Sequence, residues 1–123
     1  MTAGEAIRRT DRIMPNAYDD EQKMGWLSNL DGRIWAELIV THEGMQPVFY
    51  PEGGYTDGGE ELLVDEAWAE DVYCNYLMAQ IAASNAEINK YNVYARLYNT
   101  AYEAWAAHFK RTHKARRSGT WRM

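Results

Sequence analysis

Apolar residues recur at intervals of three and four in several stretches of the chain, the spacing that places them on one face of an α-helix. The first stretch, residues 2–13, is short and contains few apolar residues. Thr2 is suited to cap its start, and Pro15 ends it because the residue before a proline avoids the α region. We expect this first helix to lean on the molecule without forming core.

A second helix is predicted to begin near Asp19, where Gln22 follows three residues later in a capping-box pattern. It should run to about Thr41 and end at Gly44. Its expected buried face consists of Met24, Leu27, Leu30 or Asp31, Ile34 and Leu38.

The second helix also carries small residues on another face. Gly25 and Gly32 each cost a helix about 1 kcal/mol relative to alanine. Together with Asn29 and Ala36 they form a stripe of small residues, which lets another helix approach closely. We predict that this stripe is an interface between copies of the chain. The alternative is that the glycines are simply tolerated on a solvated face.

Two further helices are predicted in the second half. The third starts after Asp65 and carries Trp68, Val72, Tyr76 or Leu77, and Ile81. Ser84 and Glu87 form a capping-box pattern that starts a fourth helix, although one uninterrupted helix is the alternative. The fourth runs to about Thr112, and one face of it carries Tyr91, Tyr94, Tyr98, Ala101 or Tyr102, Trp105 and Phe109.

Residues 45–65 lack the helical period. Two short β-prone runs, 46–50 and 61–64, flank a glycine-rich connection, which predicts a β-hairpin or loop that projects from the helices. The connection contains no lysine and so does not match a phosphate-binding loop. Ordering so many glycines costs entropy, and we therefore expect a partner to hold this loop. The predicted partner-binding residues are Phe49, Tyr50, Gly53, Gly54, Tyr55, Gly58 and Gly59.

The chain ends in a basic segment, residues 114–123, without an amphipathic period. We interpret it as an extended arm that binds a partner through Lys114, Arg116, Arg117, Trp121 and Arg122. The alternatives are a solubilising tail and a contact with DNA. The predicted organisation is therefore a mainly α fold: a small bundle of three to four helices over residues 1–113, a projecting insertion at 45–65, and the arm.

Length and composition narrow the class of protein. With 123 residues, 46 % of them hydrophobic, the chain fits one domain with its own core. One cysteine, Cys74, excludes an internal disulfide and a multi-cysteine zinc site, and we expect it to be a buried structural residue. The charged N-terminus argues against a secretory signal, and no apolar run predicts a membrane span.

Charge is distributed unevenly along the chain, whose net value is −5. Residues 41–89 contain ten carboxylates and no lysine or arginine, whereas residues 90–123 contain eight basic residues and one acidic residue. This asymmetry predicts a molecule with two differently charged ends, or else solvated faces that differ in sign by chance. The acidic balance disfavours a general nucleic-acid coat.

The residue patterns of known catalysis are missing. The spacing of His108 and His113 does not suit a shared metal on one helical face, and the acids at 19–21 fit a helix start better than a metal site. The tyrosines of the last two helices, interleaved with asparagines, suit a protein interface better than base stacking. We expect no enzyme activity and no cofactor.

Between roughly Met14 and His113 the chain contains the motifs YDDEQK, LDGRI and THEG and a tyrosine- and asparagine-rich run that ends in RTH. In these motifs and in the order of its segments, this part of the chain resembles the head–tail connector (adaptor) proteins of long-tailed bacteriophages. The resemblance implies a helical bundle that assembles into a ring, commonly dodecameric, beneath the portal protein at the capsid vertex.

The resemblance also implies partners and a location. The ring would continue the DNA channel, contact passing DNA without sequence specificity, and receive a stopper or tail-completion protein. The chain would be made in the host cytoplasm and reside in the neck of the virion, with no membrane involved. The alternative function, from a different class, is a small helical regulatory or nucleic-acid-binding protein that uses the basic arm as its contact.

Overall fold

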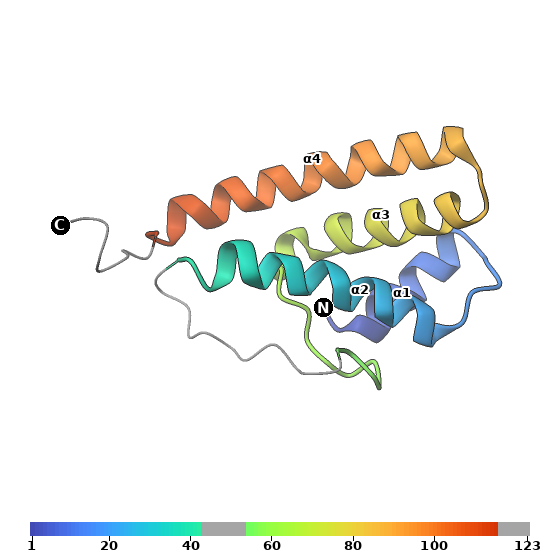
Figure 1. The fold of residues 1–123 in the computed structure, drawn as a ribbon, viewed down its shortest axis with the longest axis horizontal. Coiled ribbons are helices and arrows are strands. Elements are labelled where there is room, and N and C mark those ends of the chain that lie inside the picture. Colours follow the sequence, from blue (N-terminus) through green and yellow to red (C-terminus); the bar gives the residue numbers. More distant parts are fainter. Residues whose placement is uncertain (43–53, 116–123) are drawn as a thin grey trace.

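The computed structural model describes residues 1–42 and 54–115, and over these residues the protein is a small helical bundle (Figure 1). The helices are α1 (Ala3–Ile13), α2 (Asp20–Ile34), a π-helical turn η1 (Trp35–Ile39) that continues α2, α3 (Glu66–Ser84) and α4 (Ile88–Thr112). Helices α3 and α4 lie side by side as an antiparallel pair, and α1 and α2 pack against α3. The predicted mainly α bundle is confirmed.

Side-chain caps fix the starts of the first two helices where the sequence predicted them. Thr2 and Glu5 form a reciprocal capping box at the start of α1. The Asp19 carboxylate accepts a hydrogen bond of 2.8 Å from the backbone N–H of Gln22 at the start of α2. Each bond satisfies a backbone donor that has no partner within the helix.

Helix α1 belongs to the core, so the expectation that it merely leans on the molecule is wrong. Met1, Ala3, Ala6 and Ile7 are buried. The alanines let the α1 backbone approach α3 closely, and the thiol of Cys74 lies 3.8 Å from the carbonyl oxygen of Ala6. Small residues thus contribute to packing here through close approach rather than through their own apolar area.

The predicted break between the third and fourth helices is confirmed, but the predicted cap of the fourth helix is not. Ser84 is the last residue of α3, and α4 begins after Glu87 without a side-chain cap, so the predicted capping box is wrong. A continuous helix is wrong as well, because Ala86 has a φ of 58° that no right-handed helix accommodates. The chain reverses within three residues and returns as the antiparallel helix α4.

The aromatic face predicted for α4 is buried over its second half. Trp105 and Phe109 are each 1 % exposed, and their ring centroids lie 5.4 Å apart. The ladder of rings extends from Tyr98 and Tyr102 to His113, which stacks on Phe109 at 4.1 Å. The predicted face of α2 is also buried, with Leu27, Leu30, Asp31, Ile34 and Leu38 in the interior.

Residues 54–64 pack against the bundle and contain no strand, so the described part of the insertion does not form the predicted hairpin. The backbone N–H of Leu62 donates to the Met1 carbonyl at 2.9 Å, and the N–H of Ala3 donates to the Glu60 carbonyl at 2.9 Å. Leu62 and Val64 are buried. The β-prone run 61–64 therefore binds the N-terminus in place of a hairpin partner. Residues 43–53 lie outside the described part of the chain.

A buried carboxylate holds this segment in place. The Asp31 side chain on α2 is fully buried and accepts hydrogen bonds from the hydroxyls of Tyr73 on α3 (2.5 Å) and Tyr55 (2.6 Å). It also accepts one from the backbone N–H of Leu63 (3.0 Å). The Tyr73 hydroxyl in turn accepts from the N–H of Val64. We call these groups the Asp31 cluster; it joins α2, α3 and the segment 54–64.

Burial raises the pKa of Asp31 above its ordinary value of 3.8, and the hydrogen bonds from Tyr55, Tyr73 and Leu63 only partly oppose this shift. The folded protein therefore binds the Asp31 proton more tightly than the unfolded chain does. This contribution to stability is complete below pH 3.8 and is lost as the pH rises through the folded-state pKa.

The substitution Asp31→Asn tests this cluster. At pH 7 we expect the free energy of unfolding to fall by about 2–3 kcal/mol. The asparagine NH2 group is a hydrogen-bond donor, and it replaces a carboxylate oxygen that accepts bonds from the donors of the cluster. The wild-type advantage should grow as the pH falls from 7 toward about 4.5, because the variant lacks the titrating group. Urea unfolding of both proteins at pH 7 and at about pH 4.5 measures the difference in their free energies of unfolding. A difference that shrinks on acidification would contradict the account.

Candidate functional site

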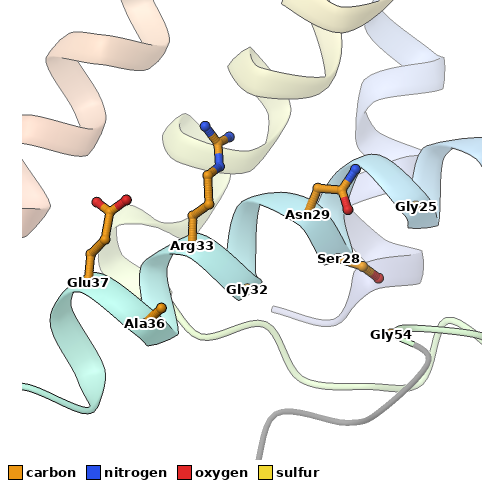
Figure 2. Close-up of a pocket in the computed structure, with 8 residues that line it drawn as sticks. All are labelled: Gly25, Ser28, Asn29, Gly32, Arg33, Ala36, Glu37 and Gly54. Carbon is orange, nitrogen blue, oxygen red and sulfur yellow. The ribbon is translucent and has the colours of Figure 1, made fainter.

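The stripe of small residues predicted from the sequence, which we call the α2 stripe, lies on the surface of α2 and η1 and borders a groove of about 550 Å³ (Figure 2). Gly25, Asn29 and Ala36 are exposed, and Gly32 is half-buried. The groove also includes Ser28 and Arg33 from α2, Glu37 from η1, and Gly54 from the segment 54–64. The structure thus brings all four predicted interface residues together along one open groove.

Two glycines of this groove, Gly25 and Gly54, differ in what they do for the subunit. Gly54 has a φ of 77°, and a Cβ there would lie 2.6 Å from the Ser28 hydroxyl, so glycine is required. Gly25 is different, because a Cβ added to it would meet nothing within 4 Å. Packing within the described chain therefore does not explain a glycine in the interior of α2.

Arg33 and Glu37 join the groove to a second, smaller hollow between α2 and α4. This hollow of about 250 Å³ is lined by the same two charged residues and by Leu30, Ile34, Tyr98, Asn99 and Tyr102. The Arg33 guanidinium donates to the Tyr76 hydroxyl at 3.3 Å. Partial burial raises the pKa of Tyr98 to about 12, so its hydroxyl stays protonated and available as a donor.

Sequence reasoning did not include Arg33 and Glu37 in the site. Their spacing places them on one side of α2, next to the stripe, and this spacing was the available signal. Their proximity to Tyr98 and Tyr102 depends on the packing of α2 against α4, which no local pattern contains. The exposed surface of α2 is thus a small-residue groove with charged and aromatic groups along one border.

The predicted partner-binding loop is only partly described, and the described part changes its interpretation. Tyr55 is 6 % exposed and belongs to the Asp31 cluster, so it is a core residue and not a binding residue. Gly58 has a φ of 86° and packs against Gly4, whose N–H donates to the Gly58 carbonyl at 2.9 Å. Gly59 and Gly54 lie in the same packed segment, whereas Phe49, Tyr50 and Gly53 lie outside the described residues.

Glu60 organises the turn before this segment enters the bundle. Its carboxylate accepts hydrogen bonds from the backbone N–H groups of Thr56, Asp57 and Gly58. These bonds, with the one from Thr56 contributing most, lower the pKa of Glu60 to about 2. The Glu60 carboxylate therefore stabilises the turn formed by its own segment.

The basic arm lies almost entirely outside the described residues. Lys114 is described and exposed, whereas Arg116, Arg117, Trp121 and Arg122 are not described. At the end of the described chain, Ala115 forms an isolated antiparallel bridge with His42. The arm therefore starts beside the end of the α2–η1 helix.

The fold places the acidic and basic segments of the sequence next to each other. Trp68 in the acidic start of α3 packs against His108 near the basic end of α4, with ring centroids 4.3 Å apart. Arg9 on α1 forms an ion pair with Glu70 on α3. The expectation of two oppositely charged ends is therefore wrong for the described part of the chain, because the turn at Ala86 returns the basic segment to the acidic one.

Candidate chemistry is sparse in residues 1–42 and 54–115. No group of three or more histidine, cysteine or acidic residues in these ranges is placed to hold a metal ion. Cys74 is buried, and burial raises the pKa of its thiol, which opposes a reactive thiolate. Asp19 serves as the cap of α2. No helix among these residues is long and apolar enough to cross a membrane.

Comparisons of the chain with protein-family models, with curated proteins and with solved structures find no match.

Gly25→Ala tests whether the groove is open in the free subunit. We expect the free energy of unfolding of the isolated chain to rise by about 0.5–1 kcal/mol, because alanine favours the helix and meets no neighbour. Chemical unfolding followed by circular dichroism measures the change. A destabilised variant would show that this face is packed within the subunit, contrary to the geometry described above.

Proposed function

We propose that this chain is a structural subunit of a phage neck, where copies form a ring below the portal, join the capsid to the tail and continue the DNA channel. The proposal combines the resemblance of residues 14–113 to head–tail connector proteins with the surfaces described above. It assigns the α2 stripe to the contact between neighbouring subunits. It assigns the basic arm to the portal or an adjoining ring protein.

The observation that carries the proposal is the unexplained glycine on the exposed face of α2. Gly25 weakens its helix by about 1 kcal/mol relative to alanine and relieves no contact within the described subunit. A neighbouring helix or loop packed against the groove would account for it, because the absence of a side chain lets backbones approach closely. Asn29 and Ala36 keep the same face shallow.

Ring assembly requires two different surfaces on each subunit that complement each other. The groove along the α2 stripe is concave and carries Arg33 and Glu37 on its border, so it offers both shape and charge to a neighbour.

A connector and the alternative nucleic-acid-binding protein differ in their expected affinity for DNA. The net charge of −5 supports a channel subunit through which DNA passes, because tight phosphate binding would slow passage. Affinity for duplex DNA at physiological salt separates the two. Weak binding supports the connector, whereas tight binding that falls steeply with added salt supports the alternative.

Gly25→Leu tests the subunit contact. We expect the purified wild-type chain, mixed with the portal ring of the same virion, to form ring-shaped particles in electron micrographs. Gly25→Leu should abolish these particles while leaving helicity unchanged, because leucine fills the groove. Gly25→Ala adds only a methyl group and should reduce assembly less.

Ala83→Leu is the matched control, since Ala83 is exposed on α3 away from the groove and the substitution also ends in leucine, although it adds three carbon atoms where Gly25→Leu adds four. If the Gly25→Leu variant forms normal rings, the α2 stripe is not part of the contact between subunits. Failure of the wild-type chain to appear in the virion neck would overturn the proposed function itself.

Truncation before Lys114 tests the arm. The truncated chain should fold as the full chain does, because the described core ends with Phe109. We expect it to lose binding to the portal ring in a sedimentation assay. Trp121→Ala should weaken binding more than Arg122→Ala, since a buried tryptophan contributes more to an interface than a peripheral charge. Full binding by the truncated chain would show that the arm is not the anchor.

A further inference from the structure

Helix α4 has a second apolar face, opposite in character to its buried aromatic face. Val93 is 47 % exposed and Leu97 is 46 % exposed. Thr100, Ala104 and Ala107 are also exposed. These five residues are spaced alternately by four and three, which is the repeat that forms the contact line between two packed helices. We call them the α4 seam.

The α4 seam borders a groove between α3 and α4. The groove has a volume of about 590 Å³, and its walls are Trp68, Asp71 and Asn75 from α3 and Leu97, Thr100, Ala101 and Ala104 from α4. It differs from the α2 groove in being lined by larger apolar side chains.

The charged residues beside the α4 seam indicate which partner packs against it. Arg96 and Glu103 are both exposed, and neither forms an ion pair with another residue in the described ranges. They lie seven residues apart, two helical turns, and therefore on the same side of the seam. When two such helices pack antiparallel, residues of this kind face each other across the contact.

A second copy of the chain supplies the complementary charges. Around a two-fold axis, Arg96 of each copy faces Glu103 of the other, which gives two equivalent ion pairs. The same register places Leu97 beside Thr100 of the second copy and Val93 beside Ala104. A parallel arrangement lacks this complementarity, because equivalent residues of the two copies, and hence like charges, come to the same level.

The wall of the groove adds a second complementary pair. Asp71 lines the groove together with Ala104. In the antiparallel register, Val93 of the second copy lies beside Ala104, and Lys90 is one helical turn away from Val93. The Lys90 ammonium, which is exposed and lies 3.2 Å from Glu87 in the subunit, comes within reach of Asp71.

From these observations we infer that the free chain forms a two-fold symmetric dimer through antiparallel packing of the α4 seams. The contact spans residues 90–107, about 27 Å of helix. It uses α4, whereas the proposed ring contact uses α2, so the dimer stands or falls independently of the neck assignment. The dimer shields the apolar seam of a subunit that has not yet joined a larger assembly.

Charge reversal tests the dimer with the full chain. Sedimentation velocity over a concentration series should give twice the mass of one chain for the wild type. Arg96→Glu and Glu103→Arg should each raise the dissociation constant about 10-fold, because each reversal creates two like-charge contacts per dimer. The double variant Arg96→Glu/Glu103→Arg should return to within about threefold of the wild type, since the pairs re-form with exchanged signs.

Apolar substitutions test the seam itself. Leu97→Glu should raise the dissociation constant at least about 100-fold, because two buried leucines are lost and two carboxylates take their places. Ile88→Glu is the control, since Ile88 is 66 % exposed but lies off the seam, and it should dimerise normally. Unchanged helicity by circular dichroism shows that each variant is folded.

Cysteine pairing fixes the orientation. A mixture of the Val93→Cys and Ala104→Cys variants should oxidise chiefly to the mixed disulfide, because these positions meet only in the antiparallel dimer. The wild-type chain, whose Cys74 is buried, should not cross-link. A chain that stays monomeric throughout, a double reversal that fails to restore dimerisation, or preferred Val93→Cys self-pairing would each overturn the inference.

Discussion

A single buried carboxylate fixes the geometry on which the candidate surfaces depend. Asp31 faces the interior from α2 and accepts hydrogen bonds from α3 and from two residues of the segment 54–64. Removing a charge from water costs free energy that only well-placed donors offset. Three segments must therefore come together at once for the cluster to form. This requirement selects one packing of α2 against α3 and one path for the chain that follows the glycine-rich loop.

The exposed side of the same helix follows from this constraint. Because Asp31, Leu27 and Leu30 turn inward, Gly25, Asn29 and Ala36 must turn outward, and Gly54 is held at the groove by the bond from the Tyr55 N–H to the Ser28 hydroxyl. A rigid helix with small side chains facing out is suited to repeated contact with identical neighbours. The α4 seam lies on another part of the surface, so the two contacts do not compete for residues.

Much of the helical structure follows from the sequence, because period and caps are local properties. The starts at Thr2 and Asp19, the buried face of α2 and the aromatic face of α4 all lie where the spacing placed them. The core position of α1 was missed because its alanines pack through close approach, which apolar counting undervalues. The break between the third and fourth helices was one of two alternatives, and the sharp turn at Ala86 could not be predicted because a positive φ at alanine has no sequence signal of the kind glycine supplies.

The candidate site was less accessible to sequence reasoning. Its four small residues follow from helical spacing, but the groove needs Gly54, whose position depends on Asp31 and Tyr55 far apart in the chain. The run 61–64 has β-forming side chains, yet it binds the N-terminus, since Leu62 and Val64 gain burial against the bundle. The α4 seam consists mostly of small residues, so its pattern in the sequence is weaker than the aromatic pattern of the same helix.

The central claim is that α2 faces a neighbouring subunit in a neck ring. An electron cryomicroscopy reconstruction of the neck of the virion that contains this chain tests it most directly. The account predicts a ring of copies below the portal, with Gly25 and Gly32 at the contact between adjacent subunits. A neck without this chain, or a ring in which the α2 stripe faces open solvent, would contradict it.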